Sequence, residues 1–587
     1  MPRSALDHIP GGYQLFAAAL AVGRRMGLEW RASPIHQLLL AGPRPEGLAA
    51  DPTDLRPTDP EAGRRILAGG FVFAGETLTT GPRGDPWDRA SPSRRFAAAL
   101  HGLGWLKDLT AHGDPGAWEA LRLTLAWRRL FGRWNSFSWA PEILERRVFN
   151  LACAIRAISG PASDAEAEQI AGDLARQARF LLGLKGGPSR AAERATVAAI
   201  AGAALGGAAG ERLLERALSR LAHVLPQTVA QDGGHASRSP QAGLELYFDL
   251  STLDEALTQR GIAASDQIAR ALDRLAGAVR FFTLADGRLA AFQGGEALSP
   301  TYIAAARAQD GAADREVPAA RGGYHRLEAR SLQIAADAAA PAAGAWSQAA
   351  CAQPLAIEVL AGRKRLIVGS GWSPGAPVPQ ALRLVDGAST ASVSDAPCGA
   401  PLSGFAARVL GPRLRDAYAI LEIRRDEAPG ALWLELAHDG WIRRFGLRHE
   451  RRLYLDIEAD ELRGEDRLVP LFGKGGAKAH GRDGRRFVPF VVRFHLHPQV
   501  SALLARDKTS VLLKVEGEET GWWLRNDALE VTLEPSTLHQ DGLTRHGQQI
   551  VLRGQARLDA GAKVRWKLSA AHERPEPADI DDAAPSE

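Results

Sequence analysis

The stretch QDGGHASRSP, residues 231–240, gathers side chains that could bind and deprotonate an acidic substrate. Arg238 could pair with a carboxylate through its forked guanidinium. His235 could act as a base or an acid because its ordinary pKa lies near neutrality, and Asp232 and Ser237 could hydrogen-bond a substrate beside it. The alternative is structural: the two glycines form a turn, and the polar side chains satisfy backbone groups ahead of the next helix.

A second group of candidates consists of histidines in the C-terminal half. His495 and His497 are two residues apart in VRFHLHP, within a predicted strand. Because strand side chains alternate, both imidazoles should point to the same face, and that spacing can hold a divalent metal such as zinc. His438 and His449, from other predicted strands, are the expected partners in this metal site. The alternative is a hydrogen-bonded structural pair without metal.

The composition limits the number of domains and the class of protein in which these candidates can lie. A chain of 587 residues is too long for one core, so we expect two or more domains. With 45% hydrophobic and 24% charged residues, it has the composition of a soluble globular protein. Its net charge is +4 without a block of Lys and Arg, which argues against nucleic-acid binding. The three cysteines form no CxxC motif, so neither a disulfide framework nor a zinc–cysteine cluster is expected.

The N-terminus predicts an amphipathic helix. MPRSALDHIPGGYQLFAAALAVGRR contains a short apolar run, but Asp7 and Pro10 precede it and Arg24 and Arg25 follow it. These charges are placed wrongly for a secretory signal, and we see no clear signal peptide. The sequence contains no apolar run long enough to span a membrane, so no integral membrane segment is expected.

Helices with short connections dominate the first half of the chain. After a helical or irregular lead-in over 1–89, residues 90–310 repeat apolar side chains three and four apart, and many segments start at Asp, Ser or Pro. Examples are DPGAWEALRLTLAWRRLFGRW, PEILERRVFNLACAIRAIS and SDAEAEQIAGDLARQARFLLGL. Short Gly- and Pro-containing connections predict antiparallel neighbours. We therefore expect paired helices that are stacked or closed into a ring.

The second half changes to a period of two. Over 320–570, short alternating runs such as ALWLELAHDG, RRLYLDIEAD and SVLLKVEG are separated by Gly, Asp and Asn turns. This pattern predicts a large antiparallel β-sandwich. The last segment, 571–587, is acidic and contains proline, which predicts a disordered tail.

Local motifs in both halves resemble the heparinase II/III-like proteins of bacteria. The resemblance runs from about residue 35 to 570 and is most specific in LRGEDRL and RFHLHP. The motifs that carry it are HGLGWLKDL (101–109), QDGGHASRSP (231–240), GYHRLEA (323–329), LAHDGW (436–441), RRLYLDIEADELRGEDRL (451–468) and VRFHLHP (492–498). It implies an incomplete (α/α) toroid packed against a C-terminal antiparallel β-sandwich.

The resemblance also implies a function. It implies a lyase that cleaves a uronate-containing, glycosaminoglycan-like acidic polysaccharide in a groove between the two domains, in the cell envelope or periplasm. Such a lyase neutralises the uronate carboxylate, removes the C5 proton with a base and protonates the leaving oxygen with an acid. Here His235, Arg238, Tyr324 and Tyr247 would be catalytic. His325 and Cys351 would join the substrate-binding residues. For Tyr324 and His325, packing at the start of a strand is the alternative.

The sequence departs from the family at two places. ACAQPLAIE, residues 350–358, places Cys351 where the family has a catalytic histidine, and a thiol is a poor proton shuttle near pH 7. A small buried residue on a strand is the alternative role for Cys351. Tyr247 comes later than the expected tyrosine, in a segment of helical period, and RATVAAIAGAALGG offers no asparagine. These departures favour an alternative function, a catalytically impaired carbohydrate-binding or envelope-polysaccharide assembly protein.

Overall fold

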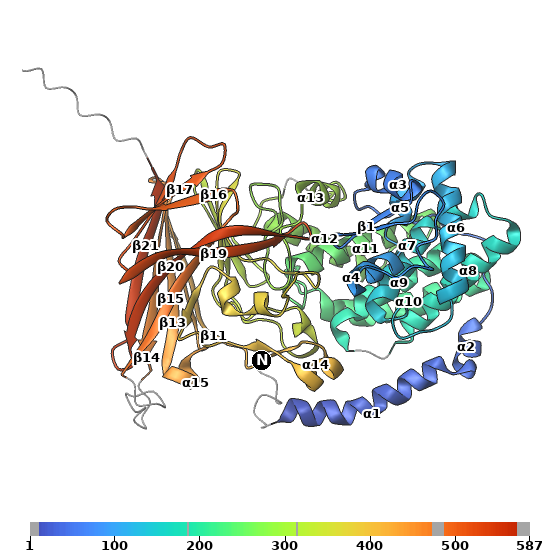
Figure 1. Cartoon of the computed structure of the whole chain (residues 1–587), viewed down its shortest axis with the longest axis horizontal. Helices are drawn as coiled ribbons and strands as arrows, with labels where there is room; N and C mark the ends of the chain where they lie inside the picture. Colours follow the sequence, from blue (N-terminus) through green and yellow to red (C-terminus); the bar gives the residue numbers. More distant parts are fainter. Residues whose placement is uncertain (1–10, 185–186, 313–314, 472–485, 572–587) are drawn as a thin grey trace, which may run out of the picture.

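The structure is a computed structural model that describes residues 11–184, 187–312, 315–471 and 486–571. It contains a helical domain beside a β-sandwich (Figure 1). The predicted order, a helical toroid followed by an antiparallel sandwich, is confirmed. The acidic tail lies beyond Ala571, outside the described residues. Within the described ranges, no helix is both long and apolar enough to cross a bilayer.

The helical domain is built around α9, a helix of small side chains. Its sequence AAERATVAAIAGAA is buried on all sides, and α7, α8, α10 and α11 pack around it. A Cβ at Gly202 would lie 2.6 Å from the backbone nitrogen of Leu214 on α10, so glycine permits this close approach. The helices of the domain are α3 (Pro60–Leu67), α4 (Arg94–His101), α5 (Leu106–Thr110), α6 (Asp114–Phe131), α7 (Pro141–Ser159), α8 (Asp164–Leu182), α9 (Ala191–Ala204), α10 (Gly207–Thr228), α11 (Pro240–Gln259), α12 (Asp266–Phe282) and α13 (Pro300–Arg307).

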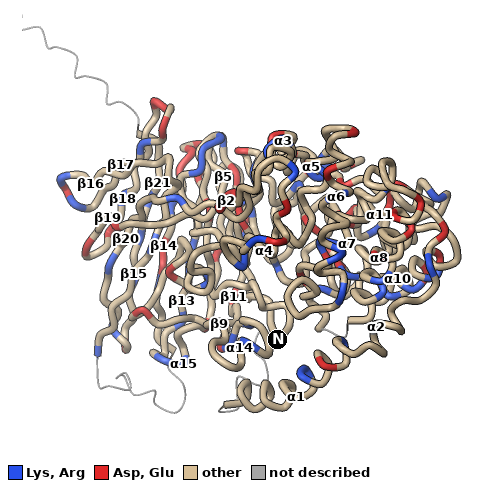
Figure 2. Tube along the Cα trace, turned by 45° about the vertical axis from the view of Figure 1, so that its right-hand side comes forward, with Lys and Arg blue, Asp and Glu red and all other residues tan. Residues whose placement is uncertain are grey.

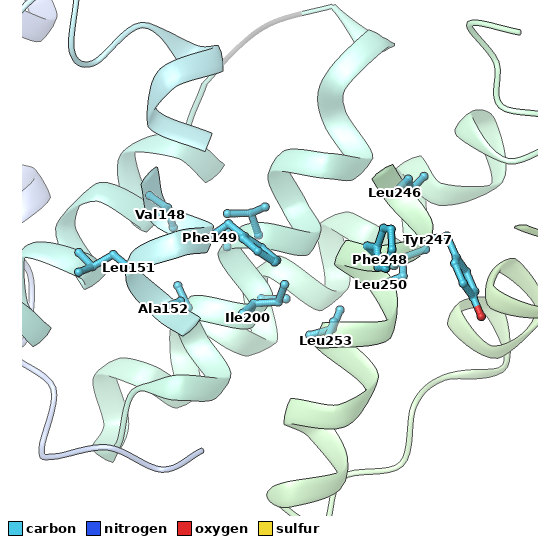
Figure 3. Close-up of a cluster of buried hydrophobic side chains, with 14 of the residues drawn as sticks. Val148, Phe149, Leu151, Ala152, Ile200, Leu246, Tyr247, Phe248, Leu250 and Leu253 are labelled. Carbon is cyan, nitrogen blue, oxygen red and sulfur yellow. The ribbon is translucent and has the colours of Figure 1, made fainter. Parts of the chain in front are cut away.

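Serines begin several of these helices as the sequence predicts. Ser163 forms a capping box with Glu166 at the start of α8, and Ser239 and Ser265 accept hydrogen bonds from backbone N–H groups of α11 and α12. Their apolar faces meet in one core, part of which is shown in Figure 3. The lead-in also contains a hairpin of β1 (Gly70–Phe73) and β2 (Glu76–Thr79), which the sequence analysis did not predict.

Two antiparallel sheets form the sandwich. One has the strand order β11-β12-β13-β14-β21-β18-β17-β16 and the other β19-β20-β15-β7-β6-β5-β4-β3, with β8 paired to β15. The first sheet consists of β11 (Ile420–Ala428), β12 (Ala431–His438), β13 (Leu447–Asp456), β14 (Glu461–Pro470), β16 (Val500–Leu504), β17 (Ser510–Val515), β18 (Trp522–Asn526) and β21 (Ala562–Ala570). The second consists of β3 (Ala320–Arg321), β4 (Tyr324–Glu328), β5 (Leu332–Asp337), β6 (Ile357–Ala361), β7 (Lys364–Val368), β8 (Ala391–Val393), β15 (Phe487–Leu496), β19 (Glu530–Gln540) and β20 (Leu543–Arg557).

The two domains share a packed boundary. Tyr324, Ala335, Ala356 and Leu360 come from the sandwich half but belong to the hydrophobic core of the helical domain. The other core lies between the two sheets. Side chains at the boundary are therefore surrounded by protein from both domains.

Helix α1 (Gly12–Ala32) lies outside both cores, whereas α2 (Pro34–Ala41) packs against the helical core through Leu40. Helix α1 packs through Tyr13 and Ala17 against Leu402, Ala406 and Leu410, which belong to α14 (Gly404–Leu410) and the residues before it. Helix α2 follows and approaches α8. Figure 1 shows α1 running along the outside of the molecule, away from the body of the helical domain. The predicted first helix is confirmed.

Candidate functional site

The loop between α10 and α11 brings the QDGGHASRSP residues to the domain boundary. An isolated bridge between Val229 and His235 closes the loop. Gly233 has a φ of 83°, and a Cβ there would lie 2.1 Å from the carbonyl oxygen of Arg274, so only glycine fits this position. Ser239 then starts α11 by accepting a hydrogen bond from the N–H of Ala242. The loop is thus fixed by its own sequence at both ends.

Asp232 and Ser237 bond to protein groups within and across this loop. One carboxylate oxygen of Asp232 accepts the N–H of Gly234 and the other accepts the N–H of Gly322, each at 2.9 Å. Asp232 therefore ties the loop to the first hairpin of the sandwich. The hydroxyl of Ser237 lies 2.7 Å from Nδ1 of His235. Their assignment to substrate binding stays a prediction, and the observed contacts are those of the structural alternative.

Arg238 directs its guanidinium toward the sandwich. It donates to the carbonyls of Ala339 and Ala340 at 3.0 Å, to that of Gly323 at 3.3 Å and to Asp337 Oδ1 at 2.5 Å. Burial opposes its charge, but the carboxylate of Asp337 raises the pKa of Arg238 above its ordinary value. The two terminal nitrogens that would grip a substrate carboxylate therefore already have partners within the protein, whereas the buried Nε of Arg238 has none.

Tyr324 closes the space beside Arg238. Its ring lies under the guanidinium, with 4.6 Å from the centroid to Cζ of Arg238, and its hydroxyl donates to the carbonyl of Arg238 at 2.8 Å. The cavity lined by His235, Arg238 and Tyr324 measures about 10 Å³. This volume is close to the minimum for one water molecule, whereas small-molecule sites measure roughly 300–1,000 Å³. A sugar ring does not fit.

His235 faces a carboxylate that the sequence analysis missed. Its Nε2 lies 3.6 Å from Oε1 of Glu193 on α9, and both residues are buried. Although burial opposes the charge of Glu193, Arg190 and His235 lower its pKa to about 2. Arg190 also pairs with buried Glu145 on α7. This cluster holds His235 from the helical side. Its only signal in the sequence is a glutamate in a helix of small apolar residues.

Cys351 joins the same boundary from the sandwich side. Its N–H donates to Gln293 Oε1 at 3.0 Å, and Nε2 of Gln293 donates to Asp337 Oδ2 at 2.8 Å, so Cys351 is linked to the partner of Arg238. The residue is 2% exposed, and burial raises the pKa of its thiol to about 11. The predicted burial is observed, but Cys351 lies in a loop before β6 and not on a strand. A protonated thiol at neutral pH cannot act as a base.

Tyr247 and His325 lie apart from this cluster. Tyr247, on α11, lines a different hollow of about 630 Å³ beside Asp254, Asp273 and Asp310. Burial raises its pKa to about 12. Figure 3 shows its hydroxyl pointing away from Phe248 and the other labelled core residues. His325 follows Tyr324 on β4, and burial lowers its pKa to about 4. Of the four residues that the resemblance implied as catalytic, His235, Arg238 and Tyr324 therefore line one small cavity, and Tyr247 lies elsewhere.

The four histidines expected at a metal site form two separate groups. His438 and His449 belong to the first sheet and hydrogen-bond to each other at 3.0 Å, and His449 also bonds to Asp466 at 2.8 Å. The other two lie on or just after β15 of the second sheet, where His495 contacts the Ser536 hydroxyl and the Asp386 carbonyl. Among the described residues, no group of three or more His, Cys, Asp or Glu could hold a metal ion. The four histidines named as possible metal ligands therefore do not form one group in the described residues, because they belong to two different sheets.

Comparisons with known proteins identify the family to which this chain belongs. Residues 314–567 match the sequence family Heparinase II/III-like, C-terminal. The chain is also 52% identical over 544 residues to FtsZ-localized protein C of Caulobacter vibrioides, covering 92% of this chain and 94% of that protein. The chain belongs to the heparinase II/III-like family. The family prediction is thereby confirmed, and the family model itself matches the C-terminal part of the chain.

Solved structures support the same fold. The heparinase III crystal structure matches 94% of this chain and 89% of its own with a TM-score of 0.68. A mutant of the heparan sulfate lyase HepC from Pedobacter heparinus matches 97% of this chain and 90% of its own with a TM-score of 0.57. Both are 13% identical in sequence, so they establish a shared fold for this family member and not a shared substrate.

Proposed function

We propose that this family member is a non-catalytic scaffold that binds a membrane surface through α1 and α2 and localises with FtsZ. The observation that carries the proposal is the exposed apolar face of the first two helices. The alternative drawn from the sequence, loss of the elimination chemistry, agrees with it because the space beside His235 and Arg238 is filled by protein. An acidic polysaccharide as the substrate is the competing function.

The apolar face of α1 is wide and solvent-exposed. Leu15, Val22 and Met26 are 68%, 65% and 67% exposed, and Phe16 and Trp30 are 41% and 49% exposed. At 100° per residue these side chains lie on one side of the helix, away from the residues that contact α14. Helix α2 extends the face with three further exposed side chains, Ile35, Leu38 and Leu39. An apolar surface of this kind marks an interaction site.

The charges of α1 indicate which surface it would contact. Arg24, Arg25 and Arg31 outnumber Glu29, the one acidic residue of the helix. Figure 2 shows these charges confined to the C-terminal half of α1. A helix with Trp, Phe and Leu on one face and Arg on another lies in a membrane interface, and basic residues near anionic lipid contribute about 1 kcal/mol each. Charge and shape therefore favour an anionic bilayer surface.

The partner in this proposal comes from a relative. FtsZ-localized protein C is 52% identical to this chain over almost its full length. Because this identity covers 92% of this chain and 94% of the relative, we infer that this chain localises with FtsZ as well. Neither the filled site nor the exposed helices require a bound glycan for this role.

Sedimentation with lipid vesicles tests the membrane part. We expect the purified chain to sediment with vesicles containing phosphatidylglycerol and far less with pure phosphatidylcholine. Val22→Asp combined with Met26→Asp should reduce the bound fraction at least tenfold, because charge on the apolar face opposes insertion. Leu529→Asp is the matched control, since Leu529 is 76% exposed on a loop far from α1 in sequence. Equal loss in both variants, or binding that ignores lipid charge, would overturn this part.

Two further measurements test the rest of the proposal. FtsZ polymers should bring the chain into the pellet in the absence of lipid, and fluorescently labelled chain should coincide with FtsZ in cells. An ultraviolet absorbance assay for unsaturated uronate, run over a panel of acidic polysaccharides, should show no product. Product formation that Arg238→Ala abolishes would establish the lyase instead. Failure to sediment with FtsZ would remove the partner but leave membrane binding standing.

A further inference from the structure

A groove lies on the outer face of the first sheet. It shares no lining residue with the cavity beside His235 and Arg238 or with α1. It measures about 570 Å³ and crosses β12, β13, β14, β21 and β18. One row of side chains follows the register of the strands across it: Trp433, Tyr454, Arg463, Lys567 and Arg525. Two aromatic rings are therefore followed by three cations in a line about 20 Å long, given about 4.8 Å between strands.

The aromatic end of the groove is accessible. Trp433 is 37% exposed, and its ring centroid lies 4.8 Å from that of Tyr454. The rings are tilted by 49° and form no flat platform for a sugar. Proline and aliphatic side chains pack well against such paired rings, as they do in peptide-binding grooves.

The cationic end carries more positive than negative charge. Arg463 and Lys567 share the carboxylate of Glu461, and Arg525 lies over the Trp523 ring with no described carboxylate within 4.0 Å. The neighbouring row alternates in sign and adds no positive charge, since Glu435 and Glu465 both face Arg452 and Arg565 pairs with Asp527. A ligand with acidic groups beside apolar groups would therefore complement the groove.

The chain contains such a segment directly after the groove. Strand β21 contributes Lys567 to the row and ends at Ala570, and residues 572–587 then read HERPEPADIDDAAPSE. This segment has six acidic residues against one arginine, together with three prolines. From Ala570 to the aromatic end is about 14 Å across the strands, whereas 16 extended residues reach roughly 50 Å. The acidic charge of this segment complements the cations of the groove, and its length is sufficient to reach the aromatic end.

We propose that the groove on the first sheet is a peptide site for extended acidic segments, and that residues 572–587 occupy it in the same chain. The acidic side chains pair with Arg525, Lys567 and Arg463, and a proline packs on Trp433 and Tyr454. Because the segment is tethered next to the site, its effective concentration is in the millimolar range. An acidic peptide from another protein must compete with it, so the tail sets a threshold for partner binding.

Fluorescence anisotropy with the full-length chain tests the proposal. The probe is a fluorescein-labelled synthetic peptide of residues 571–587, titrated with two chains. One is the wild type. The other has a neutral tail, in which Glu573, Glu576, Asp579, Asp581 and Asp582 are changed to their amides. The neutral-tail chain should bind the probe at least tenfold more tightly than the wild type, and added salt should weaken that binding.

Variants of the groove in the neutral-tail chain complete the test. Arg525→Gln with Lys567→Gln should weaken probe binding at least tenfold, and Trp433→Ala should weaken it severalfold. Arg545→Gln, on the exposed end of β20 in the other sheet, is the control and should change nothing. No binding by the neutral-tail chain, or binding that these groove changes leave intact, overturns the site. Equal binding by wild type and the neutral-tail chain overturns occupation by the tail.

Discussion

At the residue scale, the pair of Arg238 and Asp337 shows what the candidate site does in this chain. Asp337 is 1% exposed and also accepts a hydrogen bond from Gln293. Asp337→Ala should lower the free energy of unfolding by about 3–5 kcal/mol, because it leaves a buried guanidinium without its carboxylate. Asp426→Ala, which removes the exposed partner of Arg424, should cost less than about 1 kcal/mol. Urea denaturation measures both. If Asp337→Ala lowered the free energy of unfolding as little as Asp426→Ala, the backbone carbonyls alone would hold Arg238.

Sequence reasoning could find one half of this site and not the other. The spacing in QDGGHASRSP predicts a turn with His235 and Arg238 beside each other, because turn chemistry is local. Glu193 and Asp337 are their partners, yet they lie 42 and 99 residues away along the chain, on α9 and β5. Nothing in a single sequence encodes such a distant pairing. What the residues face, and so whether they bind a ligand or the protein, had to come from the fold.

At the element scale, packing across the first sheet depends on one glycine of β14. Gly464 pairs with Trp566 of β21, and a Cβ at Gly464 would lie 2.1 Å from the indole ring. Trp566 cannot move aside easily, since it is 2% exposed and donates to Asp466 at 3.0 Å. Gly464→Ala should therefore lower the free energy of unfolding by about 3 kcal/mol, at the upper end of overpacking costs. Thermal and urea denaturation measure this loss.

The control for that change is a glycine in open space. Gly172 lies on α8 with nothing within 4 Å of its would-be Cβ, so Gly172→Ala should be neutral or stabilising by up to about 1 kcal/mol. If both alanine variants behaved alike, the indole would not fix the spacing of β14 and β21. The need for glycine follows only from the neighbouring strand.

At the scale of the whole molecule, periodicity predicts the architecture better than the sites. Helical repeats followed by two-residue alternation are local signals, and the toroid followed by a sandwich is confirmed. The sheet assignment of each strand is not local. His438 and His495 both lie on strands and were both expected as metal ligands, yet their strands belong to opposite sheets. The sequence also could not predict that the apolar face of α1 is exposed, because an apolar helix face is usually buried in a core.

Buried neutral histidines in both domains predict how the whole molecule responds to acid. Burial lowers the pKa of His101, in the helical domain, and of His495 and His497, in the sandwich, to about 4. In the unfolded chain these groups titrate near 6.5, so between pH 6.5 and 5 the unfolded state binds more protons and stability falls as the pH is lowered. Each such histidine contributes a slope of up to about 1.4 kcal/mol per pH unit. His495→Gln should therefore reduce the pH dependence of the unfolding free energy, whatever its effect at pH 7. His546→Gln, at an exposed position of the sandwich, is the control substitution. Equal slopes in wild type and His495→Gln would mean that the pKa of His495 does not change on folding. Its contacts with the Asp386 carbonyl and the Ser536 hydroxyl would then offset the effect of burial.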